Sequence, residues 1–222
     1  MNKIKLDDRL KIAAEYVRHG SVAVDIGTDH AYLPVYLVQN GICERAIACD
    51  VNALPLESAK KTIGIYELSN KIEVRLSNGL CEINANECSD IVICGMGGEL
   101  IANILENCDW IKNDKYNLIL NPMTKADKLR VFLAKNGFTI KSETAAESHK
   151  KHYTIMNVYY SGEITVPDLK YTYFGKLLDD KSNVCKQLIK MTVNQLRKKA
   201  KGMDEKTAFE IEQLILEILE EI

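Results

Sequence analysis

The sequence lacks any run of about 18 consecutive apolar residues, which is near the shortest length of a membrane-spanning helix. The segment from Lys3 to Lys11 mixes charges of both signs and contains no apolar stretch of the length found in signal peptides. We therefore expect a cytoplasmic protein that makes no contact with a membrane.

Metal-ligand patterns are also missing. The seven cysteines include no C-x-x-C pair, and His30 and His149 belong to no metal-ligand spacing. No Ser-His-Asp or Cys-His arrangement is detectable. The odd number of cysteines, several of them inside apolar segments, predicts reduced thiols, and we expect no metal.

An excess of charge of either sign is absent as well. The chain has 29 Lys and Arg residues against 31 Asp and Glu residues, which gives a formal net charge of -2. Because this balance provides no global attraction to nucleic acid, any RNA binding must depend on local clusters of Lys and Arg. The 222 residues are enough for one full α/β domain and a small appendage.

Short apolar runs alternate with helical stretches along most of the chain. The runs are Val22 to Ile26, Arg45 to Cys49, Ile72 to Leu76, Asp90 to Cys94 and Leu118 to Leu120. This alternation predicts a parallel sheet built by right-handed crossovers. Two later runs, Phe138 to Ile140 and Tyr153 to Tyr160, have no helix between them and predict a terminal antiparallel pair. The series is that of class I methyltransferases, although an ordinary Rossmann domain would look similar.

The composition changes after Val166-Pro167. Apolar residues then recur at helical spacing from Leu177 to Ile222, with an interruption near Gly202. This pattern predicts two amphipathic helices, which we expect to pack as an antiparallel hairpin beside the sheet. The expected boundary lies between an α/β domain in residues 1–162 and a helical hairpin in residues 163–222.

The segment from Asp25 to Pro34 is the most informative part of the chain. It follows the apolar residues Val22 to Val24 and predicts a strand, a tight turn and a helix start, where α/β proteins hold nucleotides. Asp29 stands where the dinucleotide pattern G-x-G-x-x-G has its second glycine, and a carboxylate there would repel a pyrophosphate. A ligand with a cationic centre and no phosphate, such as S-adenosylmethionine, fits better.

The ends of the next three strands carry further candidate residues. Asp50 lies where an acidic side chain commonly accepts hydrogen bonds from a ribose; capping the helix after Pro55 is the less favoured alternative. Asn78-Gly79 either meets an adenine edge or forms a simple turn. Three glycines within Gly95 to Gly98 indicate backbone pressed close to a ligand.

Asn121-Pro122-Met123 ends the fifth predicted strand. It is similar to the Asn-Pro-Pro-aromatic turn by which some adenine methyltransferases hold the target amino group. We expect the proline to stop the strand and to aim the asparagine amide into the crevice.

Taken together, these segments resemble the bacterial tRNA (adenine-22-N1)-methyltransferase family over nearly the whole chain. The motifs that carry the resemblance are Leu6 to Leu10, Asp25 to Pro34, Arg75 to Leu80 and Cys94 to Gly98. The resemblance implies an α/β fold in which a Rossmann-like class I methyltransferase domain binds S-adenosylmethionine and a C-terminal α-helical hairpin, a coiled coil, binds tRNA. The chain departs from the family at residues 121–123, where Gln-Pro-Asn is usual, and the shorter asparagine reduces the reach of the amide.

The implied reaction transfers a methyl group to N1 of an adenine in tRNA, and position 22 comes from the family alone. N1 is a neutral lone pair, so positioning rather than a strong base must supply most of the rate. Because N1 lies on the Watson–Crick edge, the base must be unpaired or flipped. The expected catalytic residues are Asp29 and Asn121. Asp29 would accept the adenine N6–H or stabilise the cationic product; its alternative role is an N-cap for the helix at Ala31.

The remaining site predictions form two sets. The expected cofactor-binding residues are Asp25, Gly27, Asp50, Val51, Asn78, Gly79, Gly95 and Met96. The expected substrate-binding residues are Arg9, His30, Tyr32, Pro122, Arg130, Arg197 and Lys198, with Tyr32 and Met96 as a wall for the base. Two rival functions stay open, an NAD-dependent oxidoreductase and a non-catalytic RNA-binding or scaffold protein that uses the hairpin. The oligomeric state is also open, and a monomer is one option.

Overall fold

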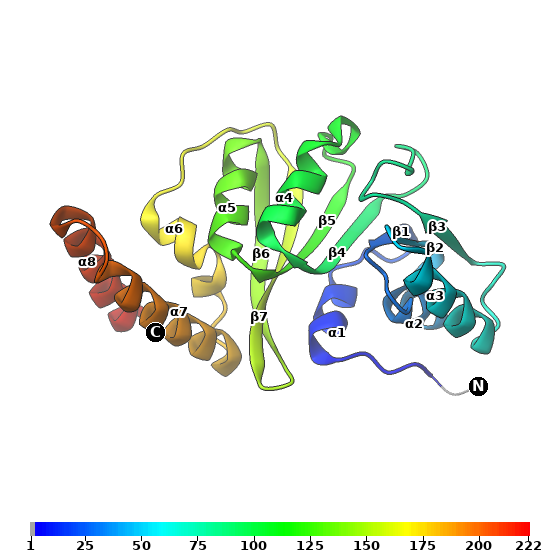
Figure 1. Ribbon diagram of the computed structural model, residues 1–222, viewed down its shortest axis with the longest axis horizontal. Coiled ribbons are helices and arrows are strands. Elements are labelled where there is room, and N and C mark those ends of the chain that lie inside the picture. Colours follow the sequence, from blue (N-terminus) through cyan, green and yellow to red (C-terminus); the bar gives the residue numbers. More distant parts are fainter. Residues whose placement is uncertain (1–2) are drawn as a thin grey trace.

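A central β-sheet organises the computed structural model, which describes residues 3–222 (Figure 1). These residues form seven strands in the order β3-β2-β1-β4-β5-β7-β6. The parallel strands are β1 (Ser21–Ile26), β2 (Cys43–Asp50), β3 (Ile72–Leu76), β4 (Asp90–Gly97) and β5 (Asn117–Thr124). The antiparallel strands are β6 (Phe138–Ser148) and β7 (Lys151–Tyr160). The predicted α/β fold with its terminal antiparallel pair is confirmed.

Helices cover both faces of the sheet. They are α1 (Asp8–Glu15), α2 (Tyr32–Gln39), α3 (Ala53–Ile65), α4 (Gly98–Glu106) and α5 (Ala126–Lys135), with a short 3-10 helix, η1 (Asp109–Ile111). Side chains of α1, α2 and α3 form one core with one face of the strands, and those of α4 and α5 form a second core with the other. Successive residues of β1, such as Ala23 and Val24, point into opposite cores. Burial on both faces explains the continuous apolar runs of the parallel strands.

The β6 strand is much longer than its apolar run predicts. The pairing of β6 with β7 extends from Phe138 opposite Tyr160 to Ser148 opposite Lys151. Polar residues such as Glu143, which is 4% exposed, interrupt the apolar pattern although they are buried. The apolar run underestimates the strand because its outer half packs against α1 on one face and against the C-terminal helices on the other, with polar residues among the buried ones.

The C-terminal segment contains the predicted hairpin and two additional short helices. The hairpin helices are α7 (Asn183–Ala200) and α8 (Glu205–Glu221), which are preceded by α6 (Leu169–Phe174) and the 3-10 helix η2 (Leu177–Asp179). Apolar side chains of α6, α7 and α8 form a third core. Ser182 and Asp204 cap α7 and α8 by accepting hydrogen bonds from the backbone N–H groups of Cys185 and Thr207. Leu177 belongs to η2 rather than to the first long helix.

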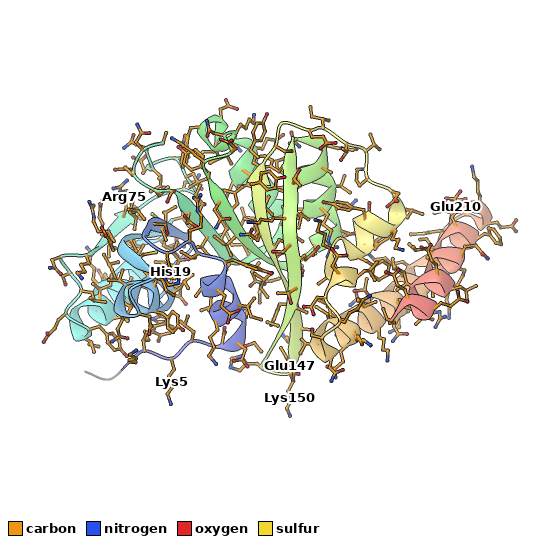
Figure 2. The ribbon with its side chains drawn as sticks, turned by 180° about the vertical axis from the view of Figure 1, so that it is seen from behind. Lys5, His19, Arg75, Glu147, Lys150 and Glu210 are labelled. Atoms are coloured by element: carbon orange, nitrogen blue, oxygen red, sulfur yellow. The ribbon has the colours of Figure 1, made fainter. Side chains whose placement is uncertain are left out.

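The hairpin and the β3 edge lie at opposite ends of the molecule. Figure 2 shows Glu210 of the hairpin at one end and Arg75 of β3 at the other. Arg75 fixes the loop between β3 and β4, because its guanidinium donates to the Glu82 carbonyl at 2.8 Å and to the Glu87 carboxylate at 2.6 Å. Within residues 3–222, no helix has both the length and the apolar character that crossing a membrane requires.

Candidate active site

The carboxyl ends of the parallel strands meet along one edge of the sheet. The register pairs Ile26 of β1 with Cys49 of β2 and with Ile93 of β4, and it pairs Cys94 of β4 with Asn121 of β5. The predicted site residues that follow β1, β2 and β4 are therefore brought together. This edge is where open α/β sheets bind their ligands.

A cleft of about 370 Å³, the crevice, opens at this edge. Its walls come from the start of α1, from the turn between β1 and α2 and from the end of β4. Among the predicted site residues, those that line the crevice are Arg9, Asp25, Gly27, Asp29, His30, Tyr32 and Gly95. Predictions made from three separate sequence segments thus fall on one cavity.

The turn after β1 is held in an unusual backbone conformation. Gly27 has a φ of 77°, and the non-glycine residues Asp29 and Ala31 have φ values of 52° and 55°. Such left-handed backbone in non-glycine residues is uncommon and clusters at functional sites. The α2 helix begins at Tyr32, and within the described chain no side chain caps its first turn. Asp29 therefore does not serve as the N-cap that was its alternative role.

The side chains of this turn project toward solvent at the crevice. The Asp29 side chain is 69% exposed, and its carboxylate lies 3.5 Å from Nε2 of His30. The His30 and Tyr32 rings stack with their centroids 5.2 Å apart. The arrangement places an available carboxylate next to a flat aromatic surface, which suits a planar base that carries hydrogen-bond donors.

Asp25 forms the floor of the crevice. It is 6% exposed, and one carboxylate oxygen accepts a hydrogen bond from the Thr28 hydroxyl at 2.7 Å. Burial raises the pKa of Asp25 from its ordinary 3.8 to about 6, whereas Thr28 and Arg9 lower it and Asp50 raises it further. A cationic ligand would offset the cost of burying this charge, so the floor suits a positively charged group.

Asn121 differs from its prediction. It is fully buried, its amide N–H donates to the Thr154 carbonyl at 2.8 Å, and its amide oxygen accepts from the Arg9 guanidinium at 3.0 Å. The expectation that this amide is free to contact the target base is therefore wrong. Asn121 instead positions Arg9, whose guanidinium forms part of the crevice wall. The expected end of the strand at Pro122 is also wrong, because β5 continues to Thr124 with an irregular register opposite Met96 and Gly97.

Asp50 keeps a geometry compatible with ribose binding. Its carboxylate accepts a hydrogen bond from the Asn52 backbone N–H at 2.9 Å. The α3 helix starts at Ala53 and its N-cap residue is Asn52, so Asp50 lies two residues before the N-cap and bonds the N–H of that residue rather than an N–H of the first helical turn. Val51 beside it is 58% exposed. The acid thus lies at the open end of β2, one strand away from Asp25.

The glycines at the strand ends make room for neighbouring groups. The ε-methyl of Met96 occupies the space that a Cβ on Gly27 would need, so Met96 packs onto the first turn. Gly79 has a φ of 58°, and a Cβ there would lie 3.0 Å from Ile104, which explains the turn at Asn78-Gly79. A Cβ on Gly95 would approach the Arg9 guanidinium at 3.6 Å. Met96 therefore packs behind the first turn and does not line the crevice, so it provides no wall for the base there.

Arg130 is not a surface cation. It is 2% exposed, pairs with buried Glu143 at 2.6 Å and donates to the carbonyl oxygens of Thr172 and Tyr173. The prediction that it contacts substrate is wrong, because all of this bonding is internal and ties α5 and β6 to α6. Gly175 has a φ of 52°, and a Cβ there would collide with both members of the pair.

The remaining basic residues do not form a single patch. Arg197 and Lys198 line a groove between α7 and α8, and Arg197 lies 3.9 Å from Glu212. Lys199 faces the α/β domain, where its ammonium lies 4.0 Å from the Asp127 carboxylate. Pro122 is buried and lines a cavity between that domain and the hairpin rather than the crevice.

Several residues that shape the site were not identified from the sequence. Asp7 caps α1 through the Leu10 N–H at 2.8 Å and lies 3.4 Å from the Arg9 guanidinium. An aspartate directly before a helix is a recognisable cap signal that would have found it. Tyr153, whose ring centroid lies 6.0 Å from the Arg9 guanidinium carbon, carries no such signal. Among residues 3–222, no group of three His, Cys, Asp or Glu side chains is placed to hold a metal ion.

Comparisons with known proteins agree with this geometry. A family model described as "Methyltransferase domain" matches residues 6–156. The tRNA (adenine(22)-N(1))-methyltransferase of Bacillus subtilis (strain 168) is 40% identical over 156 residues, which cover 70% of this chain and 66% of that protein. The crystal structure of the B. subtilis M1A22 tRNA methyltransferase TrmK is 30% identical with a TM-score of 0.81, and the match covers 99% of this chain and 97% of that one. The structure of M. capricolum TrmK in complex with S-adenosyl-homocysteine is 28% identical with a TM-score of 0.80, covering 98% and 99% of the two chains.

Proposed function

The chain belongs to the tRNA (adenine(22)-N1)-methyltransferase family, and we propose that it transfers a methyl group from S-adenosylmethionine to N1 of adenine 22 in tRNA. The observation that carries this proposal is the crevice itself. Asp25 lies buried at its floor and Asp29 lies exposed at its rim, so the cavity favours a cationic ligand together with a base that donates hydrogen bonds.

The same geometry disfavours a dinucleotide. A pyrophosphate needs backbone N–H groups and glycines at the first turn, whereas this turn presents the Asp29 carboxylate. The family relative from M. capricolum was solved with S-adenosyl-homocysteine, the demethylated form of the proposed cofactor. Asp50 would hold the ribose, and Asn78, Gly79, Gly95 and Val51 would surround the adenosine. An NAD-dependent oxidoreductase is therefore not proposed.

S-adenosylmethionine, when bound, supplies a methyl group on a positively charged sulfur. The side chains of this chain would hold the target base against that methyl group. Tyr32, which is 44% exposed and stacked on His30, offers a flat surface for the flipped base. Asp29 would accept the adenine N6–H and stabilise the positive charge that the base acquires when N1 is methylated. Arg9, held by Asn121 and Asp7, would orient the nucleotide from the opposite wall.

We assign the two predicted units different roles. Residues 1–162 would bind the cofactor and the target base, and residues 163–222 would bind tRNA away from the reacting base through Arg197 and Lys198. We propose that the enzyme acts in the cytoplasm, because its proposed substrate is tRNA. A non-catalytic RNA-binding protein is the weaker reading, because the relatives that match this chain are named as methyltransferases.

Mass-spectrometric analysis of nucleosides tests the proposal. Unmodified tRNA is incubated with the protein and S-adenosylmethionine, then digested and analysed for 1-methyladenosine. A tRNA with guanine at position 22 is the matched control. We expect 1-methyladenosine from the first tRNA and none from the second. If both tRNAs stay unmodified although the protein binds them, the non-catalytic alternative would replace the proposal.

A further inference from the structure

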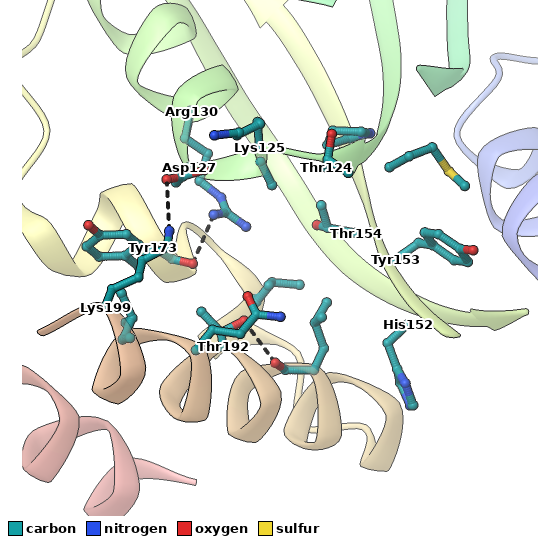
Figure 3. Close-up of a pocket in the computed structure, with 17 residues that line it drawn as sticks. Thr124, Lys125, Asp127, Arg130, His152, Tyr153, Thr154, Tyr173, Thr192 and Lys199 are labelled. Carbon is teal, nitrogen blue, oxygen red and sulfur yellow. Dashed lines mark hydrogen bonds and ion pairs between the residues drawn. The ribbon is translucent and has the colours of Figure 1, made fainter. Parts of the chain in front are cut away.

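A second cleft of about 400 Å³ lies between the methyltransferase-like domain and the C-terminal helices (Figure 3). The domain contributes the turn between β5 and α5 and part of β7, and the C-terminal segment contributes α6 and α7. The residues that matter for its chemistry are Lys125, Asp127, Tyr153, Tyr173, Gln195 and Lys199. The cleft is distinct from the crevice, with which it shares no lining residue.

One buried side chain separates the two cavities. Arg9 lines the crevice and Thr154 lines the second cleft, and Asn121 binds both of them, at 3.0 Å and 2.8 Å. The ring of Tyr153 lines the second cleft while its centroid lies 6.0 Å from the Arg9 guanidinium carbon. Ligands in the two cavities would therefore be close neighbours, as consecutive nucleotides of one strand are.

The chemistry of the second cleft matches a single-stranded nucleotide. Tyr153 and Tyr173 provide aromatic rings from opposite sides of the cleft (Figure 3), and such rings bind unstacked bases. Lys125 is exposed at the start of α5, and the Lys199 ammonium lies 5.9 Å from the Tyr173 ring centroid and 4.0 Å from the Asp127 carboxylate. Two lysines against one half-buried acid leave a positive excess for a phosphate. Arg130 adds no charge, because Glu143 neutralises it.

We propose that the second cleft holds an unpaired nucleotide of the tRNA that is adjacent in sequence to the target adenine. The inference rests on the proposed function. It assigns a specific role to the junction between the two units: the base to be methylated enters the crevice, and its neighbour is held between Tyr153 and the C-terminal helices. The neighbour would then fix the direction of the strand across the Arg9–Asn121 partition.

A substitution that fills the cleft tests this proposal. Gln195 is exposed on α7 and lines the cleft, so Gln195→Trp obstructs it without disturbing a core. The matched control is Gln213→Trp on α8, where the glutamine is also exposed and lines none of the cavities described here. Binding is measured by fluorescence anisotropy with tRNAs that are intact or abasic at the position before or after the target adenine. Methylation rates and S-adenosylmethionine affinity are measured in parallel.

We expect Gln195→Trp to weaken tRNA binding about tenfold, the scale of losing one stacked base, while Gln213→Trp and the affinity for S-adenosylmethionine stay unchanged. One of the two abasic tRNAs should bind the parent protein about tenfold more weakly than intact tRNA does. The same abasic tRNA and intact tRNA should bind the Gln195→Trp variant equally well. Equal binding by both tryptophan variants, or additive losses, would overturn the proposal. Absence of methylation by the parent, with this binding pattern intact, would instead overturn the proposed reaction alone.

Discussion

Two buried aspartates at opposite ends of the same pair of strands differ in how completely they are bonded. Asp90, at the start of β4, is fully buried, and its carboxylate accepts hydrogen bonds from Arg18, Ser89 and Asn117. Asp25, near the end of β1, is 6% exposed, accepts one side-chain hydrogen bond from Thr28 and faces the crevice. A saturated buried carboxylate fixes structure, whereas an incompletely bonded one at a cavity leaves bonding capacity for a ligand.

The largest effect on stability is expected from replacing Asp90, the aspartate whose hydrogen bonds are complete. Asp90→Ala leaves the Arg18 guanidinium and the Asn117 amide without their buried acceptor, so we expect a loss of about 3–5 kcal/mol in the free energy of unfolding. Urea denaturation measures it. Asp114→Ala, at an exposed aspartate, should change stability by no more than about 0.5 kcal/mol. A loss below about 1 kcal/mol for Asp90→Ala would contradict the structural role.

Asp25 should instead make stability depend on pH. The pKa is raised in the folded state from 3.8 to about 6, so the unfolded chain ionises first as pH rises. The parent should therefore lose stability between about pH 4 and pH 6 and then level off, by about 3 kcal/mol at 1.36 kcal/mol per pKa unit. Asp25→Asn removes this contribution. Denaturation at a series of pH values measures the difference between the two proteins, and parallel curves would refute it.

Asp29 tests whether the exposed acid of the crevice acts on substrate. We expect Asp29→Ala to reduce the turnover number roughly 10²-fold, because it removes a charge from beside the base that becomes cationic. The affinity for S-adenosylmethionine should stay near that of the parent, as measured by calorimetric titration. Asp114→Ala again serves as the control. Turnover near the parental rate would leave Asp29 with a role in the turn only.

Asp50 tests the cofactor end of the same edge. Asp50→Ala should weaken binding of S-adenosylmethionine and of its demethylated product by roughly 1.5–3 kcal/mol, the scale of a charge-assisted hydrogen bond. The Asn52 N–H that loses its acceptor is exposed, so the fold should tolerate the change. Titration calorimetry on both ligands is the measurement. An unchanged affinity in the folded variant would remove the ribose assignment.

The sequence predicts local features of this edge better than distant contacts. The parallel strands and the turn from Asp25 to Pro34 could be found because each is encoded in a few consecutive residues. The partner of Asn121 is Arg9, 112 residues away, and nothing near residue 121 indicates that its amide is already bonded. Arg130 likewise looks like a surface cation until β6 places Glu143 beside it. The local sequence pattern does not indicate burial that arises when segments distant in sequence pack together.

The smallest expected effect concerns the hairpin, which lies apart from both ends of these strands. Arg197 and Lys198 line the groove between α7 and α8, and Arg197 is only weakly engaged by Glu212 at 3.9 Å. Replacing both with alanine should weaken binding to tRNAs of any sequence and should flatten the slope of log affinity against log salt by about 0.7–0.9 for each phosphate that is no longer neutralised. The control is the double alanine variant of Lys60 and Lys61, two adjacent exposed lysines on α3. It removes the same amount of positive charge. Electrophoretic mobility across a salt series measures both. If both double variants show the same slope as the parent, Arg197 and Lys198 do not contact phosphates. The hairpin then binds RNA through other residues or forms a contact between copies of the chain. Sedimentation of the parent protein distinguishes these two outcomes.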